Sequence, residues 1–356
     1  MATIYSNLKK LSDKNGAIEF QAEIPAEIIE RYALDELARY AEGFALPGFR
    51  KGKVPHALVR QHVGEMELLE GAADEALRDA MREIVDAESL DVLGRPELTV
   101  TKIAPQNPLE FTIRFAKAPD VSLPDYRKIA KTVMEKKRDL SVTDEEIDEA
   151  IGRIRSMTGM APANEGETPA PLTDEEAKKF GPFENAEAFK KELAKSLLRE
   201  KELHEKDRVR EAMIEAIVAQ AKVKVPPMLI DQELREFTED RDRRIADAGL
   251  SMEQYLKETK KTADALAEEE RALIEKDITM SLVIRALRAK EPSMEPSERD
   301  IQLMIARLKL RDPDRDEGSL RRSAEASMIQ EKLFAMLEGT DAAAAHGDAA
   351  SPAETV

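Results

Sequence analysis

The stretch LEFTIRFA, residues 109–116, places an apolar side chain at every second position. A period of two is typical of a β-strand that buries one face of a sheet. The apolar run over 98–103 precedes it, and the two together predict a β-hairpin. A second hairpin is predicted nearer the N-terminus, where strand-like runs over 4–11 and 17–24 flank an Asn-Gly pair, a strong signal for a tight turn.

Helices are expected in most of the remaining chain. Between the hairpins, apolar spacing and prolines predict helices from Pro25 to about Glu42, from near Pro55, and from about Glu65 to Glu88. Beyond residue 172, capping residues and Gly or Pro breakers predict a helix after Thr173 and then helices over 185–220, 227–248, a short one after 251, 262–289, 297–311 and 317–338. We therefore expect an α+β fold: an N-terminal sheet of two hairpins with helices, then an elongated all-helical C-terminal domain with arms.

The expected domain organisation is linear. Residues 1–117 form the α/β domain, 118–171 a connector and linker, 172–338 the helical domain, and 339–356 a disordered tail. The tail is small and polar, and it has no apolar periodicity of its own.

The connector is expected to be partly extended. Pro119, Pro124 and a run over 129–136 predict a chain that follows a surface. A capping-box pattern, TDEE, then predicts a helix over 143–157. Residues 158–172 are rich in Gly and Pro and predict a flexible linker.

Composition excludes several classes of protein. The chain has no Cys, which excludes disulfides, zinc-thiolate sites, iron–sulfur clusters and thiol catalysis. Its 55 Lys and Arg against 72 Asp and Glu give a net charge of −17, so phosphate would be repelled over most of the surface. No apolar run approaches the roughly 18 residues of a membrane span, and the start MATIYSNLKKLSDKNG has no apolar core of a secretory signal. We expect a cytoplasmic protein with neither a membrane nor DNA as partner.

Catalytic and metal-binding patterns are nearly absent. His56 and His62 are six positions apart, which does not place them on one helix face as a metal-binding pair. Asp and Glu alternate with Lys and Arg at helical spacing, as over 231–244, which predicts solvated, ion-paired faces. No metal and no cofactor are expected.

The segment GFRKGKV, residues 48–54, resembles a nucleotide-binding P-loop at first sight. A P-loop has four residues between its glycines and a Ser or Thr after the Lys, whereas here three residues intervene and Val54 follows. Pro55 also removes an amide that a phosphate would use. ATP binding is therefore rejected.

The same region nevertheless has an unusual charge. Residues 43–64 contain no Asp or Glu, although the chain average, 22 × 72/356, gives about four. The cations of this region are Arg50, Lys51, Lys53 and Arg60. Gly and Pro pairs predict a loop between helices, with the cations and Phe49 projecting from its tip as a small RNA-contacting patch. The alternative is a solvated turn with Phe49 packed against the helices.

The octapeptide GFRKGKVP, residues 48–55, resembles the ribosome-docking signature of the bacterial trigger factor family. It occurs at the expected place, between the first two helices of the N-terminal domain. Residues 96–126 resemble the second hairpin and exit segment of that family, 172–202 the start of its C-terminal domain, and 221–234 the turn into its helical arm. The resemblance covers most of residues 1–338.

This resemblance implies an ATP-independent chaperone that docks beside the ribosomal tunnel exit and shields apolar segments of nascent chains. The docking residues that it implies are Gly48, Phe49, Arg50, Lys51, Gly52, Lys53 and Pro55. The ring and cations would contact ribosomal RNA and an exit-site protein, while the glycines and the proline would set the loop shape. The implied partners are the large ribosomal subunit, unfolded nascent polypeptides and, weakly, a second copy of the chain.

One departure from the family is large. Trigger factors usually carry an FKBP-like peptidyl-prolyl isomerase domain before the segment that begins at Leu172, but here only residues 158–171 occupy that place. Such a domain needs roughly a hundred residues and an aromatic-lined pocket. We therefore do not expect isomerase activity, and we expect the protein not to be an enzyme.

Dispersed apolar side chains on charged helices suit weak, promiscuous contact with substrates. The candidate substrate-contacting residues are Met213, Met228, Met280, Met304, Met328 and Met336. For each of them the alternative is ordinary core packing, because apolar residues at helical spacing usually face the core.

Three other functions are kept as alternatives: a helical scaffold without ribosome contact, a proline isomerase, and a periplasmic chaperone. Salt-reversible co-sedimentation with ribosomes separates the scaffold, and a tetrapeptide assay separates the isomerase. The periplasmic chaperone requires an export signal, which is not expected from the N-terminal sequence.

Overall fold

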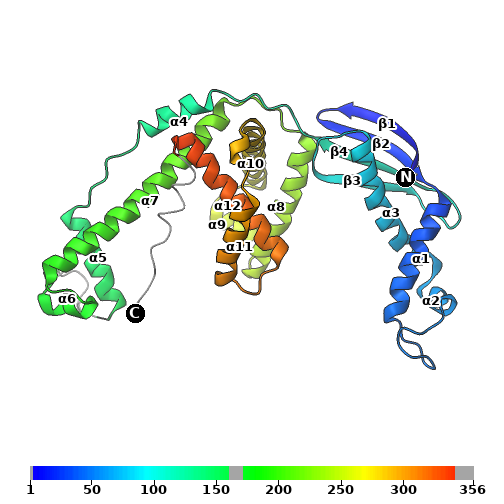
Figure 1. The fold of residues 1–356 in the computed structure, drawn as a ribbon, viewed down its shortest axis with the longest axis horizontal. Coiled ribbons are helices and arrows are strands. Elements are labelled where there is room, and N and C mark those ends of the chain that lie inside the picture. The colour runs from blue at the N-terminus through cyan, green and yellow to red at the C-terminus, as the bar shows by residue number, and fades with distance from the viewer. Residues whose placement is uncertain (1–2, 160–170, 341–356) are drawn as a thin grey trace. The chain divides into compact units, whose positions relative to one another are not determined.

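The computed structural model describes residues 3–159 and 171–340 of the chain. It is mostly helical, 64%, with one small sheet near the N-terminus (Figure 1). The chain forms two compact units. We call Met1–Ser122 with Lys222–Leu282 the sheet unit, and Leu123–Ala221 with Val283–Val356 the helical unit.

The sheet has four antiparallel strands in the order β1-β2-β4-β3, built from the two predicted hairpins. Its strands are β1 (Ser6–Lys14), β2 (Ala17–Ile24), β3 (Val92–Lys102) and β4 (Leu109–Lys117). Asn15 and Gly16 turn the first hairpin with φ values of 55° and 73°, which is the geometry that an Asn-Gly turn provides. Both hairpin predictions are confirmed, although β1 and β3 are longer than their apolar runs indicated.

One face of the sheet forms the core of the sheet unit. The buried residues of β2 and β4 are paired in register, from Ile18 opposite Phe115 to Ile24 opposite Leu109. The helix α3 (Glu65–Ala87) packs on this face with α1 (Ala26–Gly43), and its small residues Ala73, Ala76 and Ala80 are buried there. Alanine lets a helix approach closely, and the phenyl rings of the strands fill the remaining space. Both helices begin and end within about one residue of the predicted positions.

The helices after residue 222 belong partly to the sheet unit, which differs from the expected linear order of domains. They are α8 (Pro227–Asp247), α9 (Met252–Thr259) and α10 (Ala263–Lys290), of which α10 ends in the helical unit. The first turn of α8 packs Met228 and Leu229 against Ala17 and Ala116 of the sheet. The spacing of apolar residues predicted these helices, but it does not show which part of the protein they pack against.

An ion pair and a backbone bridge also hold this part together. Arg241 of α8 donates to both oxygens of the buried Glu270 carboxylate of α10, each at 2.6 Å. The backbone of Ser122 exchanges hydrogen bonds with that of Lys222, at 2.9 and 3.0 Å. The backbone bridge joins segments that lie a hundred residues apart in the sequence, at 122 and 222.

The helical unit is built around α7 (Ala186–Gln220). Its other helices are α4 (Tyr126–Met134), α5 (Asp144–Met157), α6 (Asp174–Phe180), the short 3₁₀ helix η1 (Pro292–Met294), α11 (Glu298–Arg311) and α12 (Glu317–Glu338). The predicted capping boxes of α5 and α6 are confirmed, with reciprocal side-chain and backbone hydrogen bonds at Thr143 and Thr173. Asn185 caps α7 as predicted.

The extended run predicted over 129–136 is wrong, because most of it lies in α4. The Asp125 carboxylate accepts a hydrogen bond from the Lys128 amide at 3.1 Å and caps this helix. Tyr126 and Ala130 are buried, which is the four-residue spacing of a helix face. The β-branched residues of the run and the nearby Pro124 suggested an extended chain, but packing of this face stabilises the helix.

Two predictions fall largely outside the described residues: most of the flexible linker expected over 158–172, and most of the tail expected over 339–356. Within the described ranges, none of the helices combines the length and the apolar character needed to cross a membrane.

Candidate functional site

The basic segment forms a loop between α1 and α2 (His56–Val63), and a small apolar cluster fixes both of its ends. Val54 and Val59 are buried in this cluster together with Leu37 and Leu68, and the half-buried Phe44 and Leu46 pack against it. Figure 1 shows the loop extending beyond the ends of α1 and α2. The cluster therefore holds the base of the loop and leaves its tip in solvent.

Two consecutive turns give the loop its shape. The Phe49 amide donates to the Leu46 carbonyl at 3.0 Å, and the Lys53 amide donates to the Arg50 carbonyl at 2.9 Å. The third position of each turn is a glycine with positive φ, 94° at Gly48 and 75° at Gly52. The Gly52 amide also donates to the Phe44 carbonyl at 3.0 Å and closes the loop on its own base.

Gly52 is the glycine that the fold of the loop needs most. A Cβ atom at this position would lie 2.8 Å from the Glu42 carbonyl oxygen, and its φ is in the left-handed region. A Cβ atom at Gly48 would meet nothing within 4 Å. Gly52 is therefore required by both the backbone conformation and the available space.

The tip carries the side chains that the sequence singled out. Phe49 is 43% exposed, and Arg50, Lys51 and Lys53 are exposed beside it. Pro55 is exposed as well and precedes α2, where its missing amide is not needed. The structure thus places the aromatic ring and the cations on the accessible loop rather than within the helix packing.

The loop cations differ in their pairing from the fourth cation of the region. Within the described residues, none of Arg50, Lys51 and Lys53 forms an ion pair. Arg60 is held by Glu30 at 3.0 Å and by Glu65 at 2.6 Å, which raises the pKa of its guanidinium and lowers the pKa of the Glu65 carboxyl. Arg60 therefore fastens α2 to its neighbouring helices, and it is not available to a ligand.

Sequence reasoning overlooked the residues that anchor the loop. Phe44, Leu46 and Val54 flank the glycine turns and point into the cluster. The available signal was the apolar character of these three positions on both sides of the run 47–53, which is rich in glycine and cations.

The six candidate methionines fall into two groups. Met213, Met228 and Met328 are buried, with exposed fractions of 0, 4 and 2%. Their side chains contribute to helix packing. For these three methionines, the alternative of ordinary core packing is the one that the structure shows. The half-buried candidates are Met280, Met304 and Met336.

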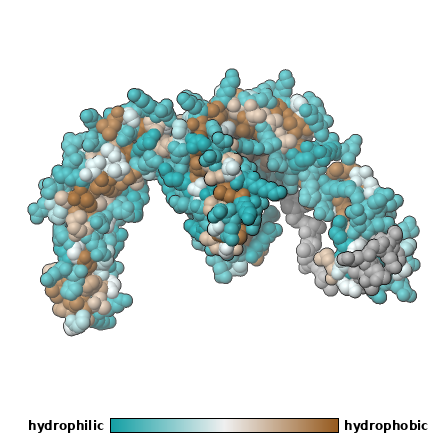
Figure 2. Space-filling view, turned by 180° about the vertical axis from the view of Figure 1, so that it is seen from behind, coloured by the Kyte–Doolittle hydropathy of each residue, from teal (hydrophilic) through white to brown (hydrophobic). Residues whose placement is uncertain are grey.

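Other apolar side chains on the helices are more accessible than these methionines. The most exposed are Met157 (87%), Leu310 (85%), Leu203 (63%) and Leu303 (56%). Figure 2 shows apolar surface in separate brown patches between teal, hydrophilic residues on the face turned to the viewer. In the sequence, such a residue is recognised as an apolar residue on the helix face that otherwise carries polar residues.

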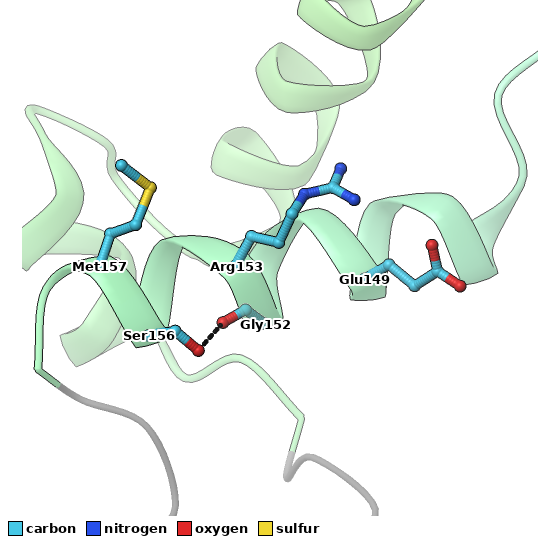
Figure 3. A pocket seen from close by; sticks show the side chains of 5 residues that line it. All are labelled: Glu149, Gly152, Arg153, Ser156 and Met157. Carbon is cyan, nitrogen blue, oxygen red and sulfur yellow. Dashed lines mark hydrogen bonds between the residues drawn. The ribbon is translucent and has the colours of Figure 1, made fainter. Parts of the chain in front are cut away.

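A shallow surface cavity of about 580 Å³ lies along α5 (Figure 3). It is lined by Glu149, Gly152, Arg153, Ser156 and Met157, all from this one helix. Ser156 donates its hydroxyl hydrogen to the Gly152 carbonyl at 3.0 Å, so the hydroxyl is occupied by its own helix. The lining contains no nucleophile next to a base, and we assign no reaction to it.

Family comparison supports the sequence resemblance over most of the chain. The model described as "Bacterial trigger factor protein (TF)" matches residues 6–154, and the model described as "Bacterial trigger factor protein (TF) C-terminus" matches residues 185–335. Neither match includes an isomerase domain, and only residues 155–184 lie between the two.

Individual proteins agree with the family models. The chain is 24% identical to the trigger factor of Agathobacter rectalis, over 80% of this chain and 83% of that protein. It is 22% identical to the trigger factor of Carboxydothermus hydrogenoformans, over 77% of this chain and 84% of that protein. It is 34% identical to the trigger factor of Mycolicibacterium vanbaalenii over a shorter region, 43% of this chain and 31% of that protein.

A solved structure of a trigger factor chaperone, from work on promiscuous substrate recognition in folding and assembly, has a similar fold. The TM-score is 0.50 at 16% identity, and the match covers 94% of this chain and 100% of that chain. The two family models, the curated relatives and this fold agree on one assignment. The chain belongs to the bacterial trigger factor family.

Proposed function

We propose that this trigger factor family chaperone docks on the large ribosomal subunit near the tunnel exit and shields apolar segments of nascent chains without ATP. One observation carries the docking proposal: Phe49, Arg50 and Lys51 are exposed together on a loop whose base is fixed by a buried cluster. A rigid base keeps the ring and the two cations in one orientation, which reduces the entropy lost on binding.

The charge pattern supports RNA as the surface that this loop contacts. The chain as a whole carries a net charge of −17, yet the loop cations have no carboxylate partners within the described residues. Guanidinium and ammonium groups bind phosphate oxygens, and an exposed aromatic ring stacks on a base or enters a protein pocket. The repulsion between the remaining surface and RNA limits the contact to this loop and makes it weak and reversible.

Shielding without ATP fits the distribution of apolar surface. The exposed Leu203, Leu303 and Leu310 and the half-buried Met280, Met304 and Met336 are dispersed among charged residues. Small, separated apolar patches give weak contacts that dissociate spontaneously, so release needs no nucleotide. We propose these residues in place of the buried methionines as the substrate-contacting set.

The remaining assignments follow from this proposal. We assign docking to residues 1–117 and shielding to residues 172–338, and a ribosome-bound chaperone would act in the cytosol. We also propose that the protein is not a peptidyl-prolyl isomerase. The 30 residues from 155 to 184 between the two matched regions are too few for a domain that needs roughly a hundred.

Co-sedimentation with ribosomes tests the docking proposal. We expect Phe49→Ala/Arg50→Ala/Lys51→Ala to lose most of its pelleting at low salt. The matched control is Lys9→Ala/Lys10→Ala/Leu11→Ala, which also removes two exposed consecutive cations and one large side chain of similar exposure, 44%. The control should pellet like the wild type. Equal pelleting of the two triple variants would contradict the proposal and favour a helical scaffold without ribosome contact.

A further inference from the structure

A groove of about 730 Å³ lies in the helical unit beside α7. Its apolar lining comes from Met134, Leu203, Val209 and Met213. Leu203 is 63% exposed and Met134 is 39% exposed, whereas Met213 is fully buried and forms the floor. A groove of this size with an apolar floor and two accessible apolar side chains is suited to a ligand with apolar groups.

The shape of the groove follows from the periodicity of α7. Its lining residues on this helix, from Arg199 through Leu203 and Lys206 to Met213, recur at spacings of three, four and seven positions and share one face. Fourteen positions along a helix correspond to about 21 Å. Met134 at the end of α4, Lys137 beyond it, Glu338 at the end of α12 and Thr340 after that helix complete the lining. A groove of this length accommodates an extended segment of about six residues.

The charged part of the lining has more cations than carboxylates. Lys137, Arg199 and Lys206 line the groove, and none of the three forms an ion pair within the described part of the chain. Glu338 also lines it, but Arg210 holds this carboxylate at 2.6 and 3.2 Å and offsets its charge. Glu202 is the remaining carboxylate of the lining. The groove therefore has an excess of positive charge in a chain of net charge −17.

We propose that this groove binds client segments in which an apolar stretch is flanked by Asp or Glu. The inference rests on the proposed chaperone function and specifies the client chemistry at one site. The apolar stretch would cover Leu203 and Met134, while the flanking carboxylates would pair with Arg199, Lys206 and Lys137. A client segment of this kind complements both the apolar floor and the cationic rim, which a basic or purely apolar segment does not.

Two other occupants are conceivable and are separated by the experiment. Residues 341–356 begin next to Thr340 at the rim and contain Asp341, Asp348 and Glu354 but no Lys or Arg. A second copy of the chain also carries abundant carboxylates. Charge repulsion between two chains of net charge −17 opposes the second copy, and the client segment is the occupant to which we commit.

Fluorescence anisotropy with labelled peptides tests the proposal on the full chain. The two probes share a core of about six apolar residues and differ only in flanks of Asp or of Lys. At low salt we expect the Asp-flanked peptide to bind about fivefold more tightly, because two or three exposed ion pairs form. Arg199→Glu/Lys206→Glu should abolish or reverse this preference, and Leu203→Ser should weaken both peptides.

The matched control is Lys191→Glu/Lys195→Glu, which makes the same charge change on exposed positions of α7 that do not line the groove. The control should retain the wild-type preference, and an equal loss in the two double variants would overturn the proposal. Removal of residues 341–356 should leave the affinity within about twofold, because a large increase would identify the tail as the occupant. Peptide binding that changes with chain concentration over the dimerisation range would identify a second copy.

General chaperone function is measured separately, as suppression of the aggregation of a chemically unfolded client. If the wild type suppresses aggregation but the groove variants bind both peptides like the wild type, the inference about the groove fails and the proposed function stands. If the wild type does not suppress aggregation, the proposed function itself fails.

Discussion

At the scale of single residues, the shape of the loop depends on residues that would not themselves touch a partner. Val54 is buried in the cluster at the base of the loop, and Gly52 closes the loop by donating its amide to the Phe44 carbonyl. The residues that would contact RNA are free in solvent, so their positions are determined entirely by these supports. We expect the supports to affect docking as strongly as the contact residues do.

The two loop glycines are predicted to respond differently to alanine. Gly48→Ala introduces strain at a positive φ but no clash, and we expect a cost of about 1 kcal/mol. Gly52→Ala adds a contact of 2.8 Å with the Glu42 carbonyl oxygen, and we expect a cost of roughly 2 kcal/mol or more. Urea unfolding followed by circular dichroism measures both free energies. Equal costs would show that the close approach to Glu42 is relieved without strain.

Val54→Ala is predicted to lower the free energy of unfolding by roughly 2 kcal/mol, because two buried methyl groups are lost and a cavity remains. It should also weaken ribosome pelleting, although Val54 is not exposed. The control Val100→Ala removes the same methyl groups from a position that is 38% exposed in β3. It should change stability by less than about 0.5 kcal/mol. A control as destabilised as the variant would contradict the burial argument.

At the scale of elements, two attachments organise the units. In the sheet unit, α8 begins against the sheet at Gly94, where a Cβ atom would lie 2.7 Å from Leu229 Cδ2. In the helical unit, the buried Glu205 of α7 accepts a hydrogen bond from the Arg138 amide at 2.9 Å, which attaches the segment that follows α4. Each attachment depends on one residue at a point of close approach.

Gly94→Ala is predicted to loosen α8 from the sheet. The position has a φ of 66°, and a Cβ atom would also lie 2.8 Å from Oε1 of Gln232, whose Nε2 donates to the Arg95 carbonyl at 2.7 Å. We expect a loss of roughly 1–3 kcal/mol and faster hydrogen exchange in the first turns of α8. The control Gly43→Ala, whose Cβ atom meets nothing within 4 Å, should leave the exchange of α8 unchanged.

Glu205 is predicted to make the helical unit sensitive to acid. Hydrogen bonds from the Arg208 side chain, and next from the Arg138 amide, lower its pKa from 4.5 to about 2. A carboxylate whose pKa is lower in the folded state stabilises that state above its unfolded pKa. This contribution is fully present above pH 4.5 and is lost as the pH falls from 4.5 to about 2.

Thermal melting across this pH range tests the assignment. Glu205→Gln should lower the melting temperature at neutral pH and reduce its fall between pH 4.5 and 2. Glu211→Gln, at an exposed position of the same helix, is the control and should follow the wild-type profile. Parallel profiles for Glu205→Gln and the wild type would show that Glu205 does not carry the pH dependence.

At the scale of the whole molecule, charge separates the proposed docking loop from the rest of the chain. The net charge of −17 would repel RNA, and the three loop cations, which form no ion pair within residues 3–159 and 171–340, would attract it. The balance between this repulsion and this attraction depends on ionic strength, because salt screens both interactions and its cations compete for the phosphates.

Ribosome affinity is therefore predicted to fall steeply with salt. If Arg50, Lys51 and Lys53 each neutralise one phosphate, the slope of log K against log salt is about −2.1 to −2.7, and affinity drops roughly twenty- to fortyfold between about 50 and 200 mM. Lys53→Ala should make the slope shallower by about 0.7 to 0.9, which is the contribution of one phosphate contact. A slope near zero, measured by pelleting over this range, would indicate a contact without phosphate neutralisation.

Elements and their bounds could be predicted wherever the signals lie in consecutive residues. Asn185 and the prolines after Gln220 bounded α7, two capping boxes began α5 and α6, and the Asn-Gly turn fixed the first hairpin. The composition of the loop between α1 and α2 also identified its accessible cations. These features depend on local backbone chemistry, which a neighbouring residue satisfies.

Which surfaces meet became known from the three-dimensional fold. It made 126–134 a helix, packed α8 on the sheet, paired Arg60 with two carboxylates, and buried Met213 while exposing Leu203 on the same helix. Each outcome depends on a partner far away in the sequence, and helical periodicity gives the direction of an apolar side chain but not what covers it. Burial and pairing follow from long-range packing, and for this reason neither could be predicted from spacing alone.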